Sequence, residues 1–308
     1  MNQAMNEDRR IRLRAQIAKL DSISTAPVIL QPLLAILRLP ADDIQMEKVV
    51  ELVSRDGAIA AQCLRMANSP LFGCRAVETA RAAVMTLGIE RVRSILFGLC
   101  MNQIIPADKW VLDRNSFWRH SLGCALVTQT MARKIGYPEP EKAYLAGLLH
   151  DLGFLVNSVI DNAKFRECLA HAAAQRCPLH VSEQQILGYT HADAGSMLCD
   201  HWHFSQELSD VARCHHETDL LPRANPLVYL VHLSDLLCRV RSLGYGYDEI
   251  MVVTFDQDVA WSHLVAGYPA LADVDLVRFA LDIDGSMDQI AALVDSVFAP
   301  AKVAGGSA

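Results

Sequence analysis

Apolar residues recur every three or four positions through residues 23–104, without the alternation of apolar and polar residues that marks a strand. This spacing predicts a series of short amphipathic helices. They are expected at 28–37, 44–53, 57–67, 80–87 and 90–99. Pro40, Pro70 and Gly88 follow three of them, as is usual where a helix stops. The first hundred residues are therefore predicted to form a bundle of short helices.

Helical spacing continues in the second half. Ser116 is expected to be the N-cap of a helix that stops before Gly136, and Asn225-Pro226 to start a later one. Further helices are expected at 182–202, up to Cys214, and at 287–298; a turn is expected at 244–247 and a disordered tail at 304–308. The last 65 residues carry no pattern that we could connect with a function.

Polar side chains interrupt the apolar faces of this half. The apolar run 143–149 ends in His150 and Asp151, which cost free energy to bury unless they are paired or bind a cation. His120 and His191 also take inward positions on predicted helices, and Asp235 lies on the apolar side of another. A single inward histidine is more often a core residue bonded to a backbone carbonyl. Four imidazole and carboxylate ligands from separate helices, however, are able to hold one divalent ion.

Composition narrows the class of protein. The 308 residues are 52% hydrophobic, enough for packed cores, and the net charge of −7 argues against nucleic-acid binding, which needs a surplus of Lys and Arg. The nine cysteines include no CxxC pair, which favours a reducing, cytoplasmic location. No uninterrupted apolar segment reaches 18 residues and no export signal is recognisable, so no membrane span is expected. Protein or small-molecule partners fit this composition better.

Two segments of the chain, residues 1–20 and the helices around Asp56, are candidate binding surfaces. Residues 1–20 carry four arginines and are interpreted as a solvated amphipathic lead-in helix, with contact to a membrane surface or an acidic partner as the alternative. The succession of short helices around Asp56 resembles a helix-turn-helix. Its second helix offers only Arg65 to bases or phosphates, so packing is the preferred interpretation.

Two motifs resemble a known family. Residues 55–73 read RDGAIAAQCLRMANSPLFG and residues 83–93 read AVMTLGIERVR, which is similar to the N-terminal half of HDOD (HD-related output domain) proteins. This resemblance implies an all-α, multi-helix HDOD fold in which an N-terminal helical bundle packs on an HD-phosphohydrolase-like helical domain. The expected segments are a lead-in at 1–20, the N-terminal subdomain at 21–110, the HD-like subdomain at 111–243, and C-terminal helices with a flexible tail at 244–308.

The resemblance also supplies a ligand set. His120, His150, Asp151 and Asp235 appear in the order of the one-metal site of HD phosphohydrolases, and His191, His215 and His216 resemble the second-metal motifs of HD-GYP cyclic di-GMP phosphodiesterases. The implied cofactor is a divalent metal: Fe, Mn, Mg, Zn or Ni. The competing interpretation is a buried hydrogen-bonded network that only fixes the helices.

The chain departs from the HD-GYP pattern at two places. Phe154 stands where that family has a Lys near the substrate phosphate, and residues 218–222 replace its Gly-Tyr-Pro loop. We therefore expect a non-catalytic signalling module that acts through a protein partner or a nucleotide ligand. The alternative is a metal-dependent phosphohydrolase acting on a nucleotide or cyclic dinucleotide. The oligomeric state is not predicted.

Overall fold

The computed structural model describes residues 7–20, 30–39, 43–69, 76–220, 225–247 and 257–275, with the single positions 250, 254, 278, 281, 285, 288 and 292. All regular elements of these ranges are helical, so the predicted all-α class is confirmed. The helices are α1 (Glu7–Ile17), α2 (Leu30–Leu37), α3 (Met46–Ser54), α4 (Gly57–Ala67), α5 (Ala80–Leu87), α6 (Ile89–Ile104), α7 (Arg114–Ile135), α8 (Pro140–Leu149), α9 (Leu152–Ile160), α10 (Asn162–Gln175), α11 (Leu179–Ile186), α12 (His191–His201), α13 (Gln206–Cys214), α14 (Pro226–Val240) and α15 (Val259–Gly267), with short 3₁₀ helices η3 (Ala107–Lys109), η4 (Thr218–Leu220) and η6 (Pro269–Asp273). Most of the helix predicted at 287–298 and all of the tail at 304–308 lie outside the described residues.

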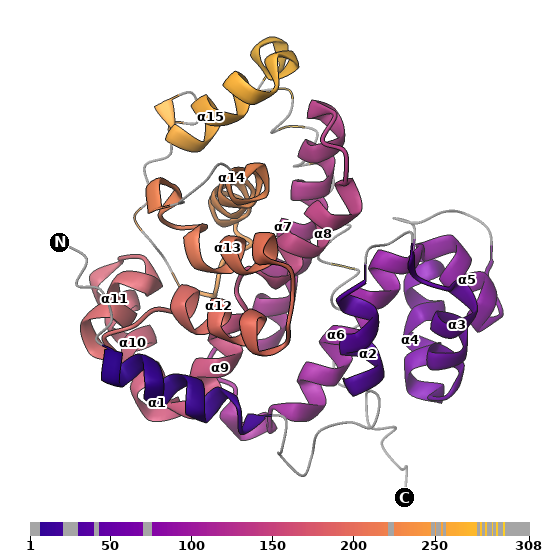
Figure 1. Cartoon of the computed structure of the whole chain (residues 1–308), viewed down its shortest axis with the longest axis horizontal. Coiled ribbons are helices and arrows are strands. Elements are labelled where there is room, and N and C mark those ends of the chain that lie inside the picture. Colours follow the sequence, from indigo (N-terminus) through magenta and orange to yellow (C-terminus); the bar gives the residue numbers. More distant parts are fainter. Residues whose placement is uncertain are drawn as a thin grey trace, which may run out of the picture.

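Helices α2 to α6 form a lobe of their own on the right of Figure 1, and α6 runs from it toward the second half of the chain. Its short helices follow the predicted boundaries closely, because each apolar stripe is buried against the next. Val49, Val53, Val84 and Leu96 are fully buried in this lobe. Burial of such stripes is the main source of stability for helices too short to persist alone.

The second lobe is built around the long helix α7, which packs against α8 and α14. The sequence predicted Ser116 as the N-cap of this helix, and that prediction is wrong. Asp113 takes that place, and its carboxylate accepts a hydrogen bond from the Ser116 backbone N–H at 2.8 Å. Both residue types are good caps, and the helix simply starts one turn earlier than predicted. Gly136 ends it in the left-handed conformation, with φ +71°.

One predicted helix is in fact two. The apolar spacing over 182–202 indicated a single helix, but α11 ends at Ile186 and α12 begins at His191. Gly188 has φ +71° in the connection, and Thr190 and Asp193 form a reciprocal capping box at the start of α12. The break makes His191 the first residue of a helix, with its side chain still buried.

Most side chains of helix α1 are exposed, as expected of an amphipathic helix with a solvated face, but its apolar side is docked on the second lobe. It packs against α9 and α12 of the second lobe, away from α2 to α5, and Figure 1 shows it lying across that lobe. Leu13 and Ile17 are buried there, whereas Ile11, between Arg10 and Arg12, is 57% exposed. The first described helix of the chain therefore belongs spatially to the second half.

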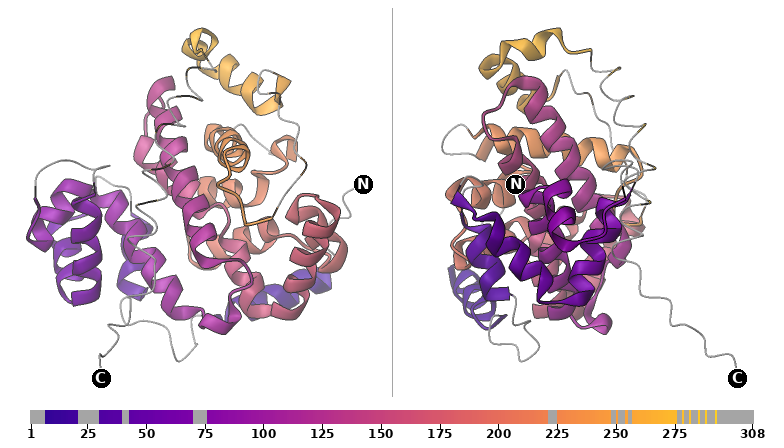
Figure 2. Two further views of the ribbon diagram at one scale, coloured as in Figure 1. Left: turned by 180° about the vertical axis from the view of Figure 1, so that it is seen from behind. Right: turned by 90° about the vertical axis from the view of Figure 1, so that its right-hand side faces the viewer.

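Residues of α6 and of the end of α2 contact the end of α12 in the second lobe. Figure 2 shows the two lobes from behind and from the side. The rings of Phe97 and Trp202 meet edge to face with centroids 6.0 Å apart, and Arg38 Nε donates to the Trp202 carbonyl at 2.6 Å. An aromatic pair of this geometry with a charge-assisted hydrogen bond fixes the two lobes against one another.

The helical stretch Pro140–Ile160 is long and apolar enough to cross a membrane by length and composition. However, 89% of its most apolar window is buried inside the protein, and the stretch includes His150 and Asp151. Such burial is typical of helices in a packed protein core, here α8 and α9.

Candidate metal centre

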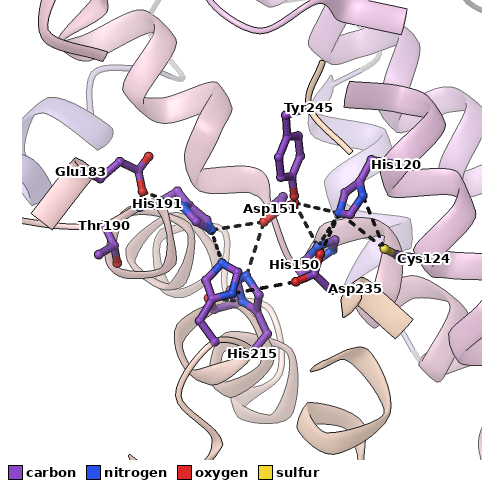
Figure 3. A network of polar contacts seen from close by, with 12 residues as sticks. His120, Cys124, His150, Asp151, Glu183, Thr190, His191, His215, Asp235 and Tyr245 are labelled. Carbon is purple, nitrogen blue, oxygen red and sulfur yellow. Dashed lines mark hydrogen bonds and ion pairs between the residues drawn. The ribbon is translucent and has the colours of Figure 1, made fainter. Parts of the chain in front are cut away.

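Five segments of the second lobe bring polar side chains to one buried place, shown in Figure 3. The side chains come from α7, the junction of α8 and α9, the start of α12, the segment after α13, and α14: His120, His150, Asp151, His191, His215, His216 and Asp235. All seven residues singled out from the sequence therefore lie together. Six are at most 1% exposed, so burial demands that their charges and hydrogen-bonding atoms be satisfied internally.

The cluster divides into two groups of potential ligands. The first, here called the His120 group, consists of His120, Cys124, His150 and Asp235, and the second, the Asp151 group, of Asp151, His191, His215 and His216. Within each group the ligand atoms lie within 4.8 Å of one another. This spacing is close enough for one cation to contact every member of a group.

Asp151 lies between the two groups. Its Oδ2 is 2.9 Å from His150 Nε2 and 3.4 Å from His120 Nε2, whereas its Oδ1 is 3.3 Å from His191 Nε2 and 3.4 Å from His215 Nε2. One carboxylate thus presents a different oxygen to each group. A bridging carboxylate of this kind is able to serve two cations at once.

Backbone carbonyls fix the orientation of three histidines. The Nδ1 atoms of His120, His150 and His215 lie 2.6 Å from the Leu243 carbonyl, 2.8 Å from that of Gly147 and 3.0 Å from that of Ala212. A carbonyl only accepts, so each Nδ1 carries a proton and donates it, and each Nε2 faces the centre. Such outer hydrogen bonds are how proteins orient histidine ligands of metals.

Glu183 plays the same part for His191. Its Oε2 accepts from both the Nδ1 and the backbone N–H of His191, at 2.6 and 2.8 Å, while Asn157 donates to its other oxygen at 3.0 Å. The sequence gave no reason to select Glu183, because its partner lies across the break between α11 and α12. Only the structure shows that its carboxylate is fully buried.

Electrostatics within the cluster favour charged forms of His120 and His191. Burial opposes an imidazolium at His120, but hydrogen bonds with Asp151 and Asp235 outweigh it and raise its pKa to about 10. Burial likewise opposes the charge on His191, and Glu183 together with Asp151 raises its pKa to about 10. Without a cation, the carboxylates therefore draw protons onto these two rings.

The opposite holds on the far side of the Asp151 group. Burial lowers the pKa of His215, and burial together with the neighbouring histidines holds the pKa of His216 well below its usual range. His180 stacks on His216 with ring centroids 4.3 Å apart, and burial lowers its pKa to about 3. The rings of His215 and His216 are therefore neutral at pH 7, and each keeps a lone pair that is able to bind a cation.

Three buried atoms test whether the residues fit a metal. Oδ1 of Asp151, Oδ1 of Asp235 and Nε2 of His215 are shielded from solvent and make only long contacts, at 3.3 to 3.4 Å, with one another or with an imidazole of the cluster, none of them with good hydrogen-bond geometry. Unsatisfied buried polar atoms are rare in native proteins and call for an explanation. All three point into the cluster and are ligand atoms of hard or borderline divalent ions, so the donor set fits a metal.

Aromatic side chains close the cluster. Phe154, which replaces the expected Lys, is 1% exposed, and its ring centroid lies 3.9 Å from that of His191 and 4.9 Å from that of Tyr245. The Tyr245 hydroxyl donates to Asp151 Oδ2. Tyr245 belongs to the predicted turn at 244–247, in a segment that carried no functional signal in the sequence. Its hydroxyl is a polar group of the site that periodicity had no means of revealing.

The chain is similar in sequence and in structure to a known protein family. The sequence model of the HDOD domain matches residues 23–218. The chain belongs to the HDOD family. An HDOD domain protein of unknown function from Geobacter sulfurreducens has a similar structure, with a TM-score of 0.77, 25% identity, and coverage of 96% of this chain and 99% of that one. The resemblance to HD-GYP enzymes in the second half rests on the motifs alone.

Two further proteins are similar to this chain. A Shewanella amazonensis protein proposed to be a phosphohydrolase superposes with a TM-score of 0.69 at 21% identity, over 96% of this chain and the whole of that one. A Treponema pallidum protein of unknown function is 24% identical over 252 residues, which cover 79% of this chain and 48% of the relative. The chain thus spans about half the length of the curated relative it matches. At these identities the similarity concerns the fold.

Proposed function

We propose that this HDOD protein is a cytoplasmic signalling module whose buried cluster holds divalent metal, and that it acts on a protein partner without turning over a phosphoester. The observation that carries the proposal is a buried set of ligand atoms whose histidines are oriented by outer hydrogen bonds, while three atoms that face the centre lack good hydrogen-bond geometry. His120, His150, Asp151 and Asp235 would hold one cation, and Asp151 with His191, His215 and His216 a second. Bound in this way, metal ties five segments of the second lobe together.

Phe154 is the main argument against turnover. A phosphohydrolase needs a cationic or hydrogen-bonding group beside the phosphate, since the developing charge lies on its oxygens. At this position the chain has a buried ring that stacks on Phe165 at 5.8 Å and covers His191. The place of the missing lysine is filled by apolar packing.

The alternative function is a metal-dependent phosphohydrolase, and the completeness of the ligand set favours it. Divalent metal in such a site polarises phosphate oxygens and activates a bound water. The chain's own residues would then have to admit a nucleotide past Phe154 and Tyr245, both at most 8% exposed. A nucleotide that binds without being hydrolysed would instead act as a signal for the module.

One preparation distinguishes these functions. Untagged protein, purified without chelator, is analysed for bound metal and assayed with cyclic di-GMP and mononucleotide phosphoesters. We expect bound metal and no hydrolysis. Turnover at ordinary enzymatic rates, on the order of 1 to 10³ per second, lost in His150→Ala and retained in His263→Ala, would establish the hydrolase instead. His263 is the matched control because it stacks on Tyr229, away from the cluster.

A further inference from the structure

Cys124 belongs to the His120 group, although its sequence context is that of a small core residue. It follows His120 by four positions on α7, a spacing that places two side chains on the same helix face. Its Sγ lies 3.5 Å from His120 Nε2 and within 4.8 Å of the ligand atoms of His150 and Asp235. Figure 3 shows the sulfur pointing toward the same space as these side chains.

A second observation points to a cation at this place. Asp235 is 1% exposed, and its Oδ1 makes a long ion pair with His120 Nε2, at 3.3 Å, without good hydrogen-bond geometry. The other oxygen of Asp235 is occupied by Arg239 Nη1 at 3.1 Å. The buried Oδ1 therefore faces the same space as the imidazole and the sulfur, and a cation bound there would contact all three.

We propose that Cys124 is a thiolate ligand of the metal held by the His120 group. This inference rests on the proposed metal centre and specifies its chemistry. The two imidazoles, the thiolate and the carboxylates of Asp235 and the bridging Asp151 form a mixed nitrogen, oxygen and sulfur donor set, which suits Zn²⁺, Fe²⁺ or Co²⁺ and disfavours Mg²⁺ and Ca²⁺. On coordination the S–H bond breaks, the sulfur keeps the electron pair and donates it to the metal, and the proton leaves to solvent water.

The thiol of Cys238 provides a matched control. It is a hydrogen-bond neighbour of Cys124 from helix α14 and is equally buried, but its sulfur is not within the His120 group. Cys124→Ser and Cys238→Ser therefore make the same small change in the same part of the core. Only the first removes a proposed ligand.

Cobalt substitution tests the proposal by spectroscopy. Metal-free wild-type protein is loaded with Co²⁺, and bound cobalt is counted while the near-ultraviolet sulfur-to-cobalt charge-transfer band is recorded. We expect the band in the wild type and in Cys238→Ser, and its loss in Cys124→Ser. Bound cobalt without the band in the wild type overturns the role of Cys124 and leaves the metal centre standing. If no cobalt binds, the metal centre itself is wrong, and the ligand with it.

A measurement on the unmodified chain covers the case in which Cys124→Ser does not fold. X-ray absorption of the zinc-loaded wild type is expected to show a sulfur scatterer at about 2.3 Å, next to nitrogen and oxygen at about 2.0 to 2.1 Å. A shell of nitrogen and oxygen alone would overturn the proposal. Excess Mg²⁺ is expected not to displace the zinc.

Discussion

The hydroxyl of Tyr245 donates to Oδ2 of Asp151, 94 residues earlier in the chain, and so links the turn after α14 to the carboxylate between the two ligand groups. Tyr245→Phe removes this donor and keeps the ring. In metal-free protein the buried carboxylate would then lose a partner, which is expected to cost about 1 to 3 kcal/mol of unfolding free energy. Bound metal compensates the carboxylate, so the loss is expected to be smaller after loading.

Urea unfolding with and without metal checks this difference. Tyr247→Phe is the control, since the Tyr247 hydroxyl donates to the Cys177 carbonyl at 3.3 Å, away from the carboxylates. Its effect should be the same in both states. An equal loss for Tyr245→Phe in the two states would show that its hydroxyl does not compensate for the absence of metal.

The two ligand groups should be separable by substitution. Asp235→Asn removes a ligand of the His120 group only, and His215→Ala one of the Asp151 group only. Each is expected to lower the metal content by the share of one group, whereas Asp151→Asn should lower both, because its two oxygens face different groups. Metal analysis of the dialysed proteins measures the content. Equal losses for all three variants would argue for a single shared cation.

Metal affinity is expected to rise with pH. The pKa values of His120 and His191 are raised to about 10 in the metal-free protein, so both rings are protonated at neutral pH and a cation must displace their protons. Affinity should therefore increase between pH about 7 and about 9, by up to tenfold per unit for each proton displaced. Competition with a chelating dye at several pH values measures this slope. A flat profile would contradict the proton displacement.

The stability of the metal-free protein is expected to change with pH in the opposite direction to the metal affinity. A histidine whose pKa is raised on folding stabilises the fold fully below its unfolded pKa of about 6.5. That contribution is lost as the pH rises through the folded pKa of about 10. The stability that these two rings supply to chelator-treated protein should therefore fall over this window, and metal should stabilise the protein most at its upper end.

Gly153 allows α9 and the start of α12 to approach closely. A Cβ at this position would lie 1.8 Å from the His191 carbonyl oxygen, which is backbone and has no room to yield. Gly153→Ala is expected to cost about 3 kcal/mol and to displace His191, lowering the metal content of the Asp151 group. Gly57→Ala, with nothing within 4 Å of the added Cβ, should be neutral or stabilise α4 by about 0.5 kcal/mol. Thermal unfolding and metal analysis of both variants test the contrast.

The sequence predicted those features of the fold that depend on neighbouring residues, and missed those that depend on distant ones. The apolar stripes defined α3, α4, α5 and α14 because each is amphipathic, and α4, α5 and α14 also have a proline, glycine or capping residue at one end or both. The break at Gly188 was missed because the apolar spacing continues in register across it. The docking of α1 was missed because burial of Leu13 and Ile17 depends on surfaces that only the folded second lobe presents.

The candidate site was predicted in the same uneven way. His150 and Asp151 could be found because two polar residues end an apolar run, and the other five because they fall in motif order. Tyr245 acts on a partner 94 residues away, and Glu183 on His191 across the break between α11 and α12, so no helical spacing rule connects either pair. Cys124 was interpreted as a small hydrophobic residue, which its burial does not distinguish from a ligand. The distance of 3.5 Å between its Sγ and His120 Nε2 is the observation that indicates a metal ligand.

The position of α1 has a consequence for dividing this protein. A cut near residue 110 follows the connectivity between the lobes, yet it would leave α1 on the wrong piece. A fragment beginning at residue 111 would bare the apolar surface of α9 and α12 that Leu13 and Ile17 cover, beside the helix that starts at His191. The second lobe is therefore a spatial unit made of two separate stretches of chain. Any attempt to excise it must carry residues 7–17 along by fusion or co-expression.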